Sequence, residues 1–236
     1  MNLTEFFYSL PQIDRAYNKY AAYSLAFNNP YRLATGVDAF RYEKFDSYLK
    51  NFIASQGKCI AMPNIVNGEV TAIMFRSCAD KLFRYYNECQ YIPYGAGVNE
   101  KPFYKPWVIV ESVLDSDFLR NFYPFVIATN GTAVSKNIMN FLQGTCSTLY
   151  CGFDYDKAGN EAFHRLCMKY SGADKCFHIK RLYTPMNLEG GYLKDFGEAL
   201  DCLFIKHIDD YDYYVLAIKN SMLNLQWQYL TMYIII

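Results

Sequence analysis

The pattern of apolar and polar positions in the middle of the chain predicts a sheet of short strands. Residues 107–110, 125–128 and 149–153 are apolar runs, and each is followed by a polar turn. Such runs are too short for a helix, and their uninterrupted apolar character is typical of strands covered on both faces. Residues 176–182 predict a fourth strand. Helical segments such as residues 158–169 lie between the runs, so the pattern predicts an α/β domain with a parallel sheet flanked by helices.

The residues before this sheet predict a smaller α+β subdomain. Residues 3–26 have the composition of a helix that Pro11 breaks, and residues 39–54 predict a second helix. The pattern then changes to strands, with Asn67-Gly68 between two apolar runs. Asparagine followed by glycine is a strong hairpin signal because both residues accept positive φ. We therefore expect a subdomain with a β-hairpin over residues 1–105, the α/β domain over residues 106–200, and C-terminal helices over residues 201–236.

Acidic residues follow the strands of the predicted parallel sheet. Glu111 ends the first strand, and Asp154 and Asp156 follow the third. Because open α/β sheets place their ligands at the carboxyl ends of the strands, these side chains are expected at one edge. Crowded carboxylates repel one another unless a cation compensates, and Mg²⁺ prefers oxygen ligands. No His or Cys lies in these turns, which argues against zinc.

Helix capping is the alternative explanation for the same acidic residues. Asp115 or Asp117 would cap a helix over residues 118–122, and Asp156 would cap the helix over residues 158–169. This explanation is adequate for any one of these positions. Their occurrence together, after successive strands, favours a site for a divalent cation, Mg²⁺ or Mn²⁺.

Charge and composition narrow the choice of partner only slightly. The net charge is zero, so the chain lacks the basic character of a protein that coats nucleic acid. Residues 1–110 hold 12 Lys and Arg against 9 Asp and Glu, whereas residues 111–236 hold 11 against 14. A basic and aromatic stretch over residues 76–94 is the candidate track for single-stranded nucleic acid or for nucleotide phosphates. The alternative is a solvated hairpin with ordinary surface charges.

The cysteines and apolar runs exclude some classes of protein. Eight cysteines occur without any Cys-x-x-Cys pair, which excludes the usual zinc ribbon. The chain opens without a signal sequence, and its longest apolar runs are much shorter than a membrane span. We therefore expect a cytoplasmic protein with reduced thiols and no contact with a membrane.

Three segments resemble the successive motifs of the Toprim domain. They are residues 108–115 (Val-Ile-Val-Glu-Ser-Val-Leu-Asp), residues 128–134 (Ala-Thr-Asn-Gly-Thr-Ala-Val) and residues 152–159 (Gly-Phe-Asp-Tyr-Asp-Lys-Ala-Gly). Toprim domains in general share the glutamate and the Asp-x-Asp. The Gly-Thr-Ala turn and the Asp-Lys-Ala-Gly tail are more characteristic of primases. Within the superfamily, the chain is therefore most similar to the RNA polymerase core of bacterial and phage DNA primases.

The resemblance implies a Toprim fold and a role for each matching residue. Glu111, Asp154 and Asp156 are the implied catalytic and metal-binding residues, and Asp115 and Asp195 are further implied metal ligands. Asp195 stands alone where the family has two aspartates close together. Thr132 is expected at the start of the helix after the second strand. Arg76 and Lys81 match positions that contact template and nucleotide in the family. Gly131, which lets the backbone approach a phosphate, Thr132 and Lys157 are further candidates for nucleotide or template binding.

The implied function is template-directed synthesis of RNA primers on single-stranded DNA during DNA replication. Such a nucleotidyltransferase takes ribonucleoside triphosphates and uses Mg²⁺ or Mn²⁺. The chain shows neither the zinc-binding domain nor the helicase of the family, so a separate helicase or template-recognition protein is the expected partner. The location would be the host cytoplasm if the source is a phage. Two alternatives remain: a Toprim metal-dependent nuclease, and a non-catalytic nucleic-acid-binding protein on the same fold.

Overall fold

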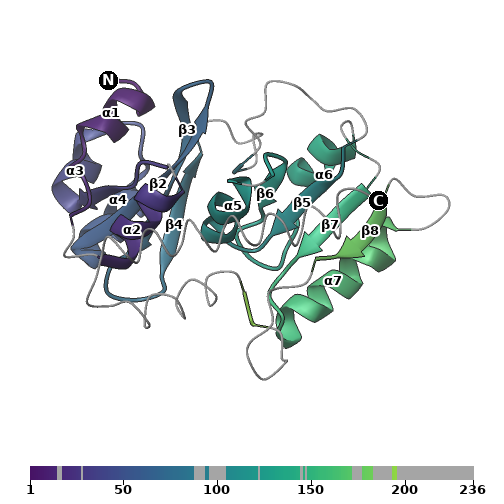
Figure 1. Ribbon diagram of the computed structural model, residues 1–236. Coiled ribbons are helices and arrows are strands. Elements are labelled where there is room, and N and C mark those ends of the chain that lie inside the picture. Colours follow the sequence, from purple (N-terminus) through teal and green to yellow (C-terminus); the bar gives the residue numbers. More distant parts are fainter. Residues whose placement is uncertain are drawn as a thin grey trace. The chain divides into compact units, whose positions relative to one another are not determined.

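The chain divides into two compact units, Met1–Ile92 and Pro93–Ile236, in the computed structural model (Figure 1). Each unit has its own four-stranded sheet and its own hydrophobic core. No helix in the part of the chain that the structure describes is long and apolar enough to cross a membrane. The predicted C-terminal helices over residues 201–236 lie outside that part. The described residues are 1–14, 18–27, 29–87, 94–95, 105–121, 123–143, 146, 148–171, 177–182 and 193–195.

The first unit is an antiparallel sheet with helices, as the pattern predicts. Its strand order is β1-β2-β3-β4, so every strand pairs with its neighbour in sequence. Asn67 and Gly68 form the turn of the β2–β3 hairpin with φ values of 55° and 82°, which confirms the predicted hairpin. The elements are α1 (Leu3–Ser9), α2 (Asn18–Ala26), β1 (Arg32–Thr35), α3 (Gly36–Arg41), α4 (Ser47–Gln56), β2 (Lys58–Val66), β3 (Glu69–Ser77) and β4 (Phe83–Asn87).

One expectation for this unit is wrong, and one of its strands was not predicted. The single helix predicted over residues 39–54 is two helices, α3 and α4. The second helix starts afresh because the Asp46 carboxylate accepts a hydrogen bond from the amide of Leu49 at 2.7 Å, as a helix cap does. The basic and aromatic stretch, in turn, contains a strand that the pattern did not predict. This strand, β4, pairs with β3 and completes the sheet.

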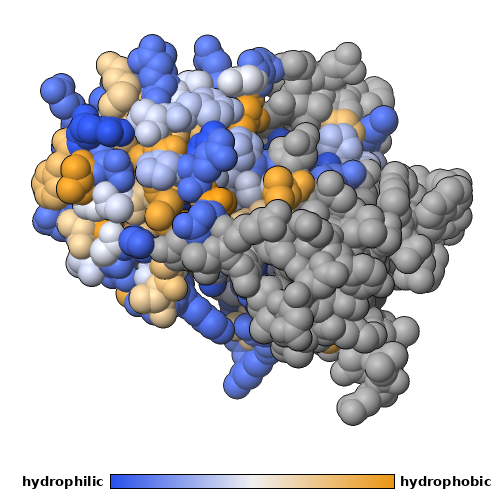
Figure 2. Space-filling view, turned by 60° about the vertical axis from the view of Figure 1, so that its left-hand side comes forward, coloured by the Kyte–Doolittle hydropathy of each residue, from blue (hydrophilic) through white to orange (hydrophobic). Residues whose placement is uncertain are grey.

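Aromatic side chains fill the core of the first unit. Phe6, Tyr42, Phe45 and Phe75 are all buried, with ring centroids 4.8 Å apart for Phe6 and Tyr42 and 5.4 Å apart for Phe45 and Phe75. These tilted and edge-on arrangements are those that aromatic pairs prefer. On the face shown in Figure 2, hydrophobic residues form separate patches among hydrophilic ones. Many aromatic residues of this unit therefore belong to its hydrophobic core.

The second unit is a parallel sheet with the strand order β6-β5-β7-β8 (Figure 1). All four residues of the central strand β5 are buried, as expected for a strand covered on both faces. The predicted α/β fold with a parallel sheet and helices is confirmed. The elements are β5 (Trp107–Val110), α5 (Val113–Arg120), β6 (Val126–Ala128), α6 (Lys136–Gln143), β7 (Thr148–Gly152), α7 (Lys157–Tyr170) and β8 (His178–Arg181).

Tyr94 and Gly95 pack within the second unit. The amide of Ala128 donates a hydrogen bond to the Tyr94 carbonyl at 3.1 Å, and the Tyr94 hydroxyl donates to the buried carboxylate of Asp117 at 3.1 Å. Gly95 has a φ of 93°, and a Cβ added there would lie 2.2 Å from the Val126 carbonyl oxygen. Only glycine allows this close approach, so the pair anchors the start of the unit against β6 and α5.

Candidate functional site

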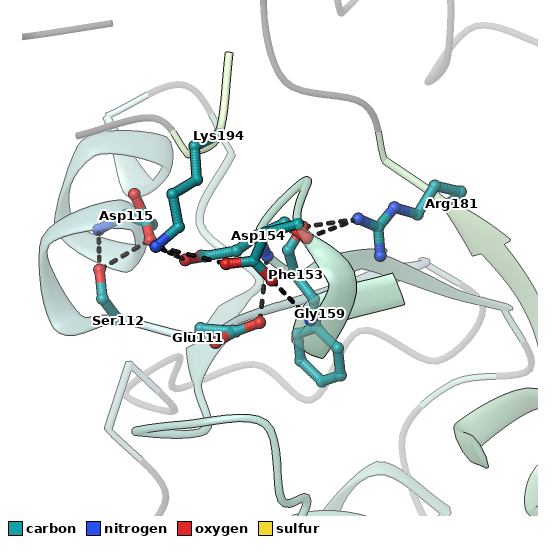
Figure 3. A network of polar contacts seen from close by, with 9 residues as sticks. Glu111, Ser112, Asp115, Phe153, Asp154, Gly159, Arg181 and Lys194 are labelled. Carbon is teal, nitrogen blue, oxygen red and sulfur yellow. Dashed lines mark hydrogen bonds and ion pairs between the residues drawn. The ribbon is translucent and has the colours of Figure 1, made fainter. Parts of the chain in front are cut away.

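The carboxyl ends of β5 and β7 bring two of the predicted acidic residues together. Val110 and Gly152 are paired at the ends of these strands, and Glu111 follows the first of them. Oε1 of Glu111 accepts a hydrogen bond from the backbone amide of Asp154 at 3.1 Å, across 43 residues of sequence (Figure 3). The parallel topology therefore places these residues side by side, as the pattern predicts.

The carboxylates of Glu111, Asp154 and Asp156 at the carboxyl ends of β5 and β7 are called the acidic edge below. Burial and mutual charge raise the pKa of two of them. Burial, and then the charge of Asp154, raise the pKa of Glu111 to about 7. Burial and the neighbouring charge of Asp195 raise the pKa of Asp154. Neighbouring charges thus disfavour ionisation of Glu111 and of Asp154, and an added cation would relieve this repulsion.

Asp156 serves as a helix cap and as a member of the acidic edge at the same time. Its Oδ1 accepts a hydrogen bond from the amide of Gly159 at 2.9 Å, which makes it the cap of α7. This hydrogen bond lowers the pKa of Asp156. Its other oxygen, Oδ2, lies 3.3 Å from the ammonium of Lys194. The capping explanation is thus correct for one oxygen and leaves the other available for a cation.

Lys194 occupies the position between the two aspartates that the sequence left unassigned. Its Nζ lies 3.3 Å from Oδ2 of Asp154 (Figure 3). The same atom lies 3.3 Å from Oδ2 of Asp156. Burial lowers the pKa of Lys194, but the two aspartates outweigh that effect and raise it. The backbone amide of Tyr155 donates a hydrogen bond to the Lys194 carbonyl. This bond holds Lys194 against residues 153–156, the turn between β7 and α7 that is called the acidic turn below. The only signal in the sequence was the position of Lys194 next to Asp195.

Arg181, at the end of β8, supports the turn that carries Asp154. Its NH2 group donates hydrogen bonds to the backbone carbonyls of Phe153 at 2.9 Å and Asp154 at 3.0 Å. The guanidinium also lies over the rings of Tyr155 and Phe163, 5.8 Å and 5.3 Å from their centroids. Sequence reasoning missed Arg181, because nothing in the pattern of a short edge strand shows which turn its last residue contacts.

Gly159 allows α7 to begin directly against the acidic turn. A Cβ added at this position would lie 2.1 Å from the Asp154 carbonyl oxygen and 2.9 Å from Oε1 of Glu111. A Cβ atom essentially never lies this close to another atom outside its own residue and chain neighbours, so any larger residue would displace the turn or the helix. The glycine of the Asp-Lys-Ala-Gly tail is therefore required by packing.

Asp115 and Asp195, the two further predicted ligands, lie in different surroundings. Asp115 is 3% exposed in the first turn of α5, where Oδ2 accepts a hydrogen bond from the Ser112 hydroxyl at 2.7 Å. Ser112, not an aspartate, is the cap of this helix, so the expectation that Asp115 or Asp117 would cap it is wrong. The charge of Asp195, the residue after Lys194, raises the pKa of Asp154. A metal-binding role for either residue stays a prediction.

The glycine turn after β6 lies beside Glu111. Gly131 has a φ of 130°, and its amide donates a hydrogen bond to the Glu111 carbonyl at 3.0 Å. Helix α6 begins only at Lys136, so the expectation that Thr132 stands at the start of this helix is wrong. The Thr129 hydroxyl donates to the Val110 carbonyl at 3.0 Å, and this contact closes the turn against β5. Thr132 lies in the turn itself and is half-buried.

The predicted basic residues are divided between the two units. Arg76 is half-buried near the end of β3, and Lys81 is exposed in the connection to β4. Both belong to the first unit, and a role for them in template binding stays a prediction. Lys157 is exposed at the first position of α7, directly after Asp156, in the second unit.

The donor set of the acidic edge fits a hard divalent cation. Glu111, Asp154 and Asp156 offer carboxylate oxygens only, which Mg²⁺ and Mn²⁺ accept. Among the described residues, no group of three or more His, Cys, Asp or Glu side chains stands ready to hold a metal ion. The Lys194 ammonium instead supplies a positive charge between Asp154 and Asp156. The crowded carboxylates thus favour a nearby cation, and in this structure the Lys194 ammonium provides that positive charge.

Comparisons with known proteins agree with this fold. Residues 108–199 match the Toprim-like family, described as Toprim_2. No curated protein sequence matches the chain. The RNA polymerase domain of the Mycobacterium tuberculosis primase DnaG is 16% identical, with a TM-score of 0.50, and the match covers 96% of this chain and 93% of that one. At this identity the match shows a shared fold.

Two further solved structures are similar. A DNA primase domain from Pseudomonas aeruginosa is 15% identical, with a TM-score of 0.48, covering 78% of this chain and 72% of that one. A DnaG primase catalytic domain bound to single-stranded DNA is 14% identical, with a TM-score of 0.47, covering 71% of this chain and 63% of that one.

Proposed function

We propose that this chain, which carries a Toprim-like domain within the fold of a primase core, is a nucleotidyltransferase that synthesises RNA primers on single-stranded DNA. The observation that supports this most is the contact between Glu111 and the turn of Asp154 and Asp156 at the sheet edge. The same edge would hold the phosphates of a ribonucleoside triphosphate close to the cation. The activity belongs to DNA replication, in the cytoplasm of the cell where the DNA is copied.

Glu111, Asp154 and Asp156 would hold Mg²⁺ or Mn²⁺, with Asp195 next to them. A bound divalent cation supplies charge neutralisation for the triphosphate and activates the primer 3′-hydroxyl for in-line attack. Asp115 lies on the helix that follows Glu111, and we retain it as a further ligand candidate.

Other groups of the chain would position the reactants. Arg181 holds the Phe153 and Asp154 carbonyls, so the turn keeps its shape when substrate arrives. The glycine turn at Gly131 and Thr132 offers backbone and a hydroxyl beside Glu111 for contact with a phosphate. Lys157 lies next to the edge and would add positive charge, while Arg76 and Lys81 of the first unit would contact template or nucleotide.

A separate helicase or template-recognition protein would complete the function. Selection of a start site would fall to such a partner. If the source is a phage, the site of action would be the cytoplasm of the infected cell.

One observation favours the non-catalytic alternative. The Lys194 ammonium already neutralises part of the charge on Asp154 and Asp156, so the edge has a counter-ion without any metal. A nucleic-acid-binding protein on this fold would need no metal ion in addition to this lysine. A nuclease remains a candidate because it would use the same edge to cut phosphodiesters.

A primer-synthesis assay distinguishes these functions. The purified chain is incubated with single-stranded DNA of mixed sequence, labelled ribonucleotides, and Mg²⁺ or Mn²⁺. We expect short RNA products that depend on the cation and on the template. Shortened template would instead indicate a nuclease. Template binding without any product, in the presence of either ion, would indicate the non-catalytic alternative.

A further inference from the structure

Lys194 contacts the acidic edge in a way that a divalent cation would have to replace. Its ammonium lies 3.3 Å from Oδ2 of Asp154 and 3.3 Å from Oδ2 of Asp156. The second oxygen of Asp156 is already committed to the amide of Gly159. A cation held by both aspartates would therefore use Oδ2 of Asp156, the oxygen that now faces the ammonium. The lysine and the cation compete for one position.

The surroundings of Lys194 allow its side chain to leave while its backbone stays. The side chain is 52% exposed, whereas that of Asp154 is 17% exposed, so the lysine reaches the buried carboxylate from the solvent side. The Lys194 carbonyl accepts a hydrogen bond from the amide of Tyr155, the residue between the two aspartates. This backbone contact does not depend on the ammonium. A displaced ammonium would remain within one side-chain length of the edge.

Charge balance gives the displaced ammonium a new partner. The side chain of Glu111 contacts the turn of Asp154 and Asp156, and Lys194 is the cation that the described contacts place between these two aspartates. A nucleotide triphosphate carries more negative charge than one divalent cation neutralises. Oxygens of the triphosphate are therefore the anions closest to a lysine that has just left Asp154 and Asp156.

We propose that Lys194 is the resident counter-ion of the acidic edge, which yields its place between Asp154 and Asp156 to a divalent cation and then contacts the phosphates of the incoming nucleotide. This inference rests on the proposed function, because it assumes that the edge binds a cation and a triphosphate. It assigns Lys194 two opposite effects: the side chain weakens binding of the cation and strengthens binding of the nucleotide.

Calorimetric titration of the metal-free chain with MnCl₂ tests the first effect. Lys194→Met removes the ammonium and keeps most of the side-chain length, and Lys169→Met removes the same charge from the exposed last turn of α7. We expect Lys194→Met to bind Mn²⁺ roughly three- to tenfold more tightly than wild type, because two partly exposed ion pairs no longer compete. Lys169→Met should bind it as wild type does.

Steady-state kinetics of primer synthesis at saturating Mn²⁺ test the second effect. We expect Lys194→Met to raise the KM for ribonucleotides roughly tenfold, the effect of losing a charged hydrogen bond, with a smaller change in kcat. Lys194→Arg should restore most of the nucleotide affinity, because it keeps the charge. Circular dichroism of each variant checks that the fold is kept.

The outcomes separate this inference from the function on which it rests. If Lys194→Met binds Mn²⁺ as weakly as wild type or more weakly, while wild type binds the ion and makes primers, Lys194 is not a competing counter-ion and only this inference fails. If wild type neither binds Mn²⁺ nor makes primers, the proposed function itself fails. A tighter Mn²⁺ titration together with an unchanged KM would overturn the second half of the proposal.

Discussion

The two sheets of this chain use their charged residues differently. In the antiparallel sheet of the first unit, successive strands run in opposite directions, so the turns lie alternately at the two ends of the strands. There the guanidinium of Arg84 lies over the rings of Tyr48 and Phe52, 5.2 Å from each centroid. In the parallel sheet of the second unit, all carboxyl ends meet at one edge, and Glu111 and Asp154 touch there. The direction of the strands therefore determines whether the acidic side chains at the strand ends come together.

The largest expected effect tests the chemistry of the second sheet. Asp154→Ala should lower cation-dependent primer synthesis at least about 100-fold, because it removes a carboxylate that the cation needs. Glu161→Ala, on the exposed side of α7, removes an acidic residue from the same unit and should change synthesis less than about twofold. Product yield per unit time measures both. Wild-type yield from Asp154→Ala would remove this residue from the mechanism.

A pair of glycine substitutions compares the packing of the two units. Gly159→Ala should lower the free energy of unfolding by at least about 2 kcal/mol, because the new methyl group would meet the Asp154 carbonyl oxygen. Gly68→Ala, in the hairpin of the first unit, has open space around it and should cost about 1 kcal/mol through its φ of 82°. Urea unfolding measures both. Equal costs would mean that α7 can move away from the acidic turn without loss.

The pH dependence of stability should show the crowding at the acidic edge. The folded-state pKa of Glu111 is raised from 4.5 to about 7, so the folded protein holds a proton that the unfolded chain has released in this range. The contribution of Glu111 therefore makes the metal-free protein less stable as pH rises from about 4.5 to about 7. Glu111→Gln should flatten this part of the profile, measured by urea unfolding at pH 5 and pH 7.5. An unchanged profile in the variant would place Glu111 in a less crowded environment.

The smallest difference between the two units is expected in the reactivity of their buried cysteines. Cys59 in β2 and Cys151 in β7 are both fully buried, and burial raises the pKa of each thiol to about 12. Both should react with iodoacetamide at pH 8 at least about 100-fold more slowly in the native protein than in guanidinium chloride. Mass spectrometry of the labelled peptides measures each site separately. Fast labelling of Cys151 alone would show that the parallel sheet opens more readily than the antiparallel one.

The sequence predicted the elements whose signals are local. The apolar run at Trp107–Val110 and the positive-φ pair Asn67 and Gly68 each determine their structure within a few residues, so strand and hairpin were predicted correctly. The helix predicted over residues 39–54 was divided because the cap at Asp46 starts a new helix in the middle of it. Strand β4 was missed because its strand character depends on pairing with β3.

The acidic site could be predicted only in part, for a related reason. Glu111 and Asp154 were found because a rule about parallel sheets predicts where strand ends meet. Lys194 and Arg181 contact the same turn from distant parts of the chain, and no rule of periodicity or spacing leads to them. Thr132 was assigned to a helix start because the Gly-Thr-Ala motif suggests one, yet α6 begins at Lys136.

The central claim is that carboxylates from two strands of the parallel sheet jointly bind a divalent cation. Titration of the metal-free chain with Mn²⁺, followed by the electron paramagnetic resonance signal of the free ion, tests it most directly. The account predicts saturable binding by wild type and at least about tenfold weaker binding by Glu111→Ala and by Asp154→Ala alike. Binding by both variants that is as tight as in wild type would contradict it.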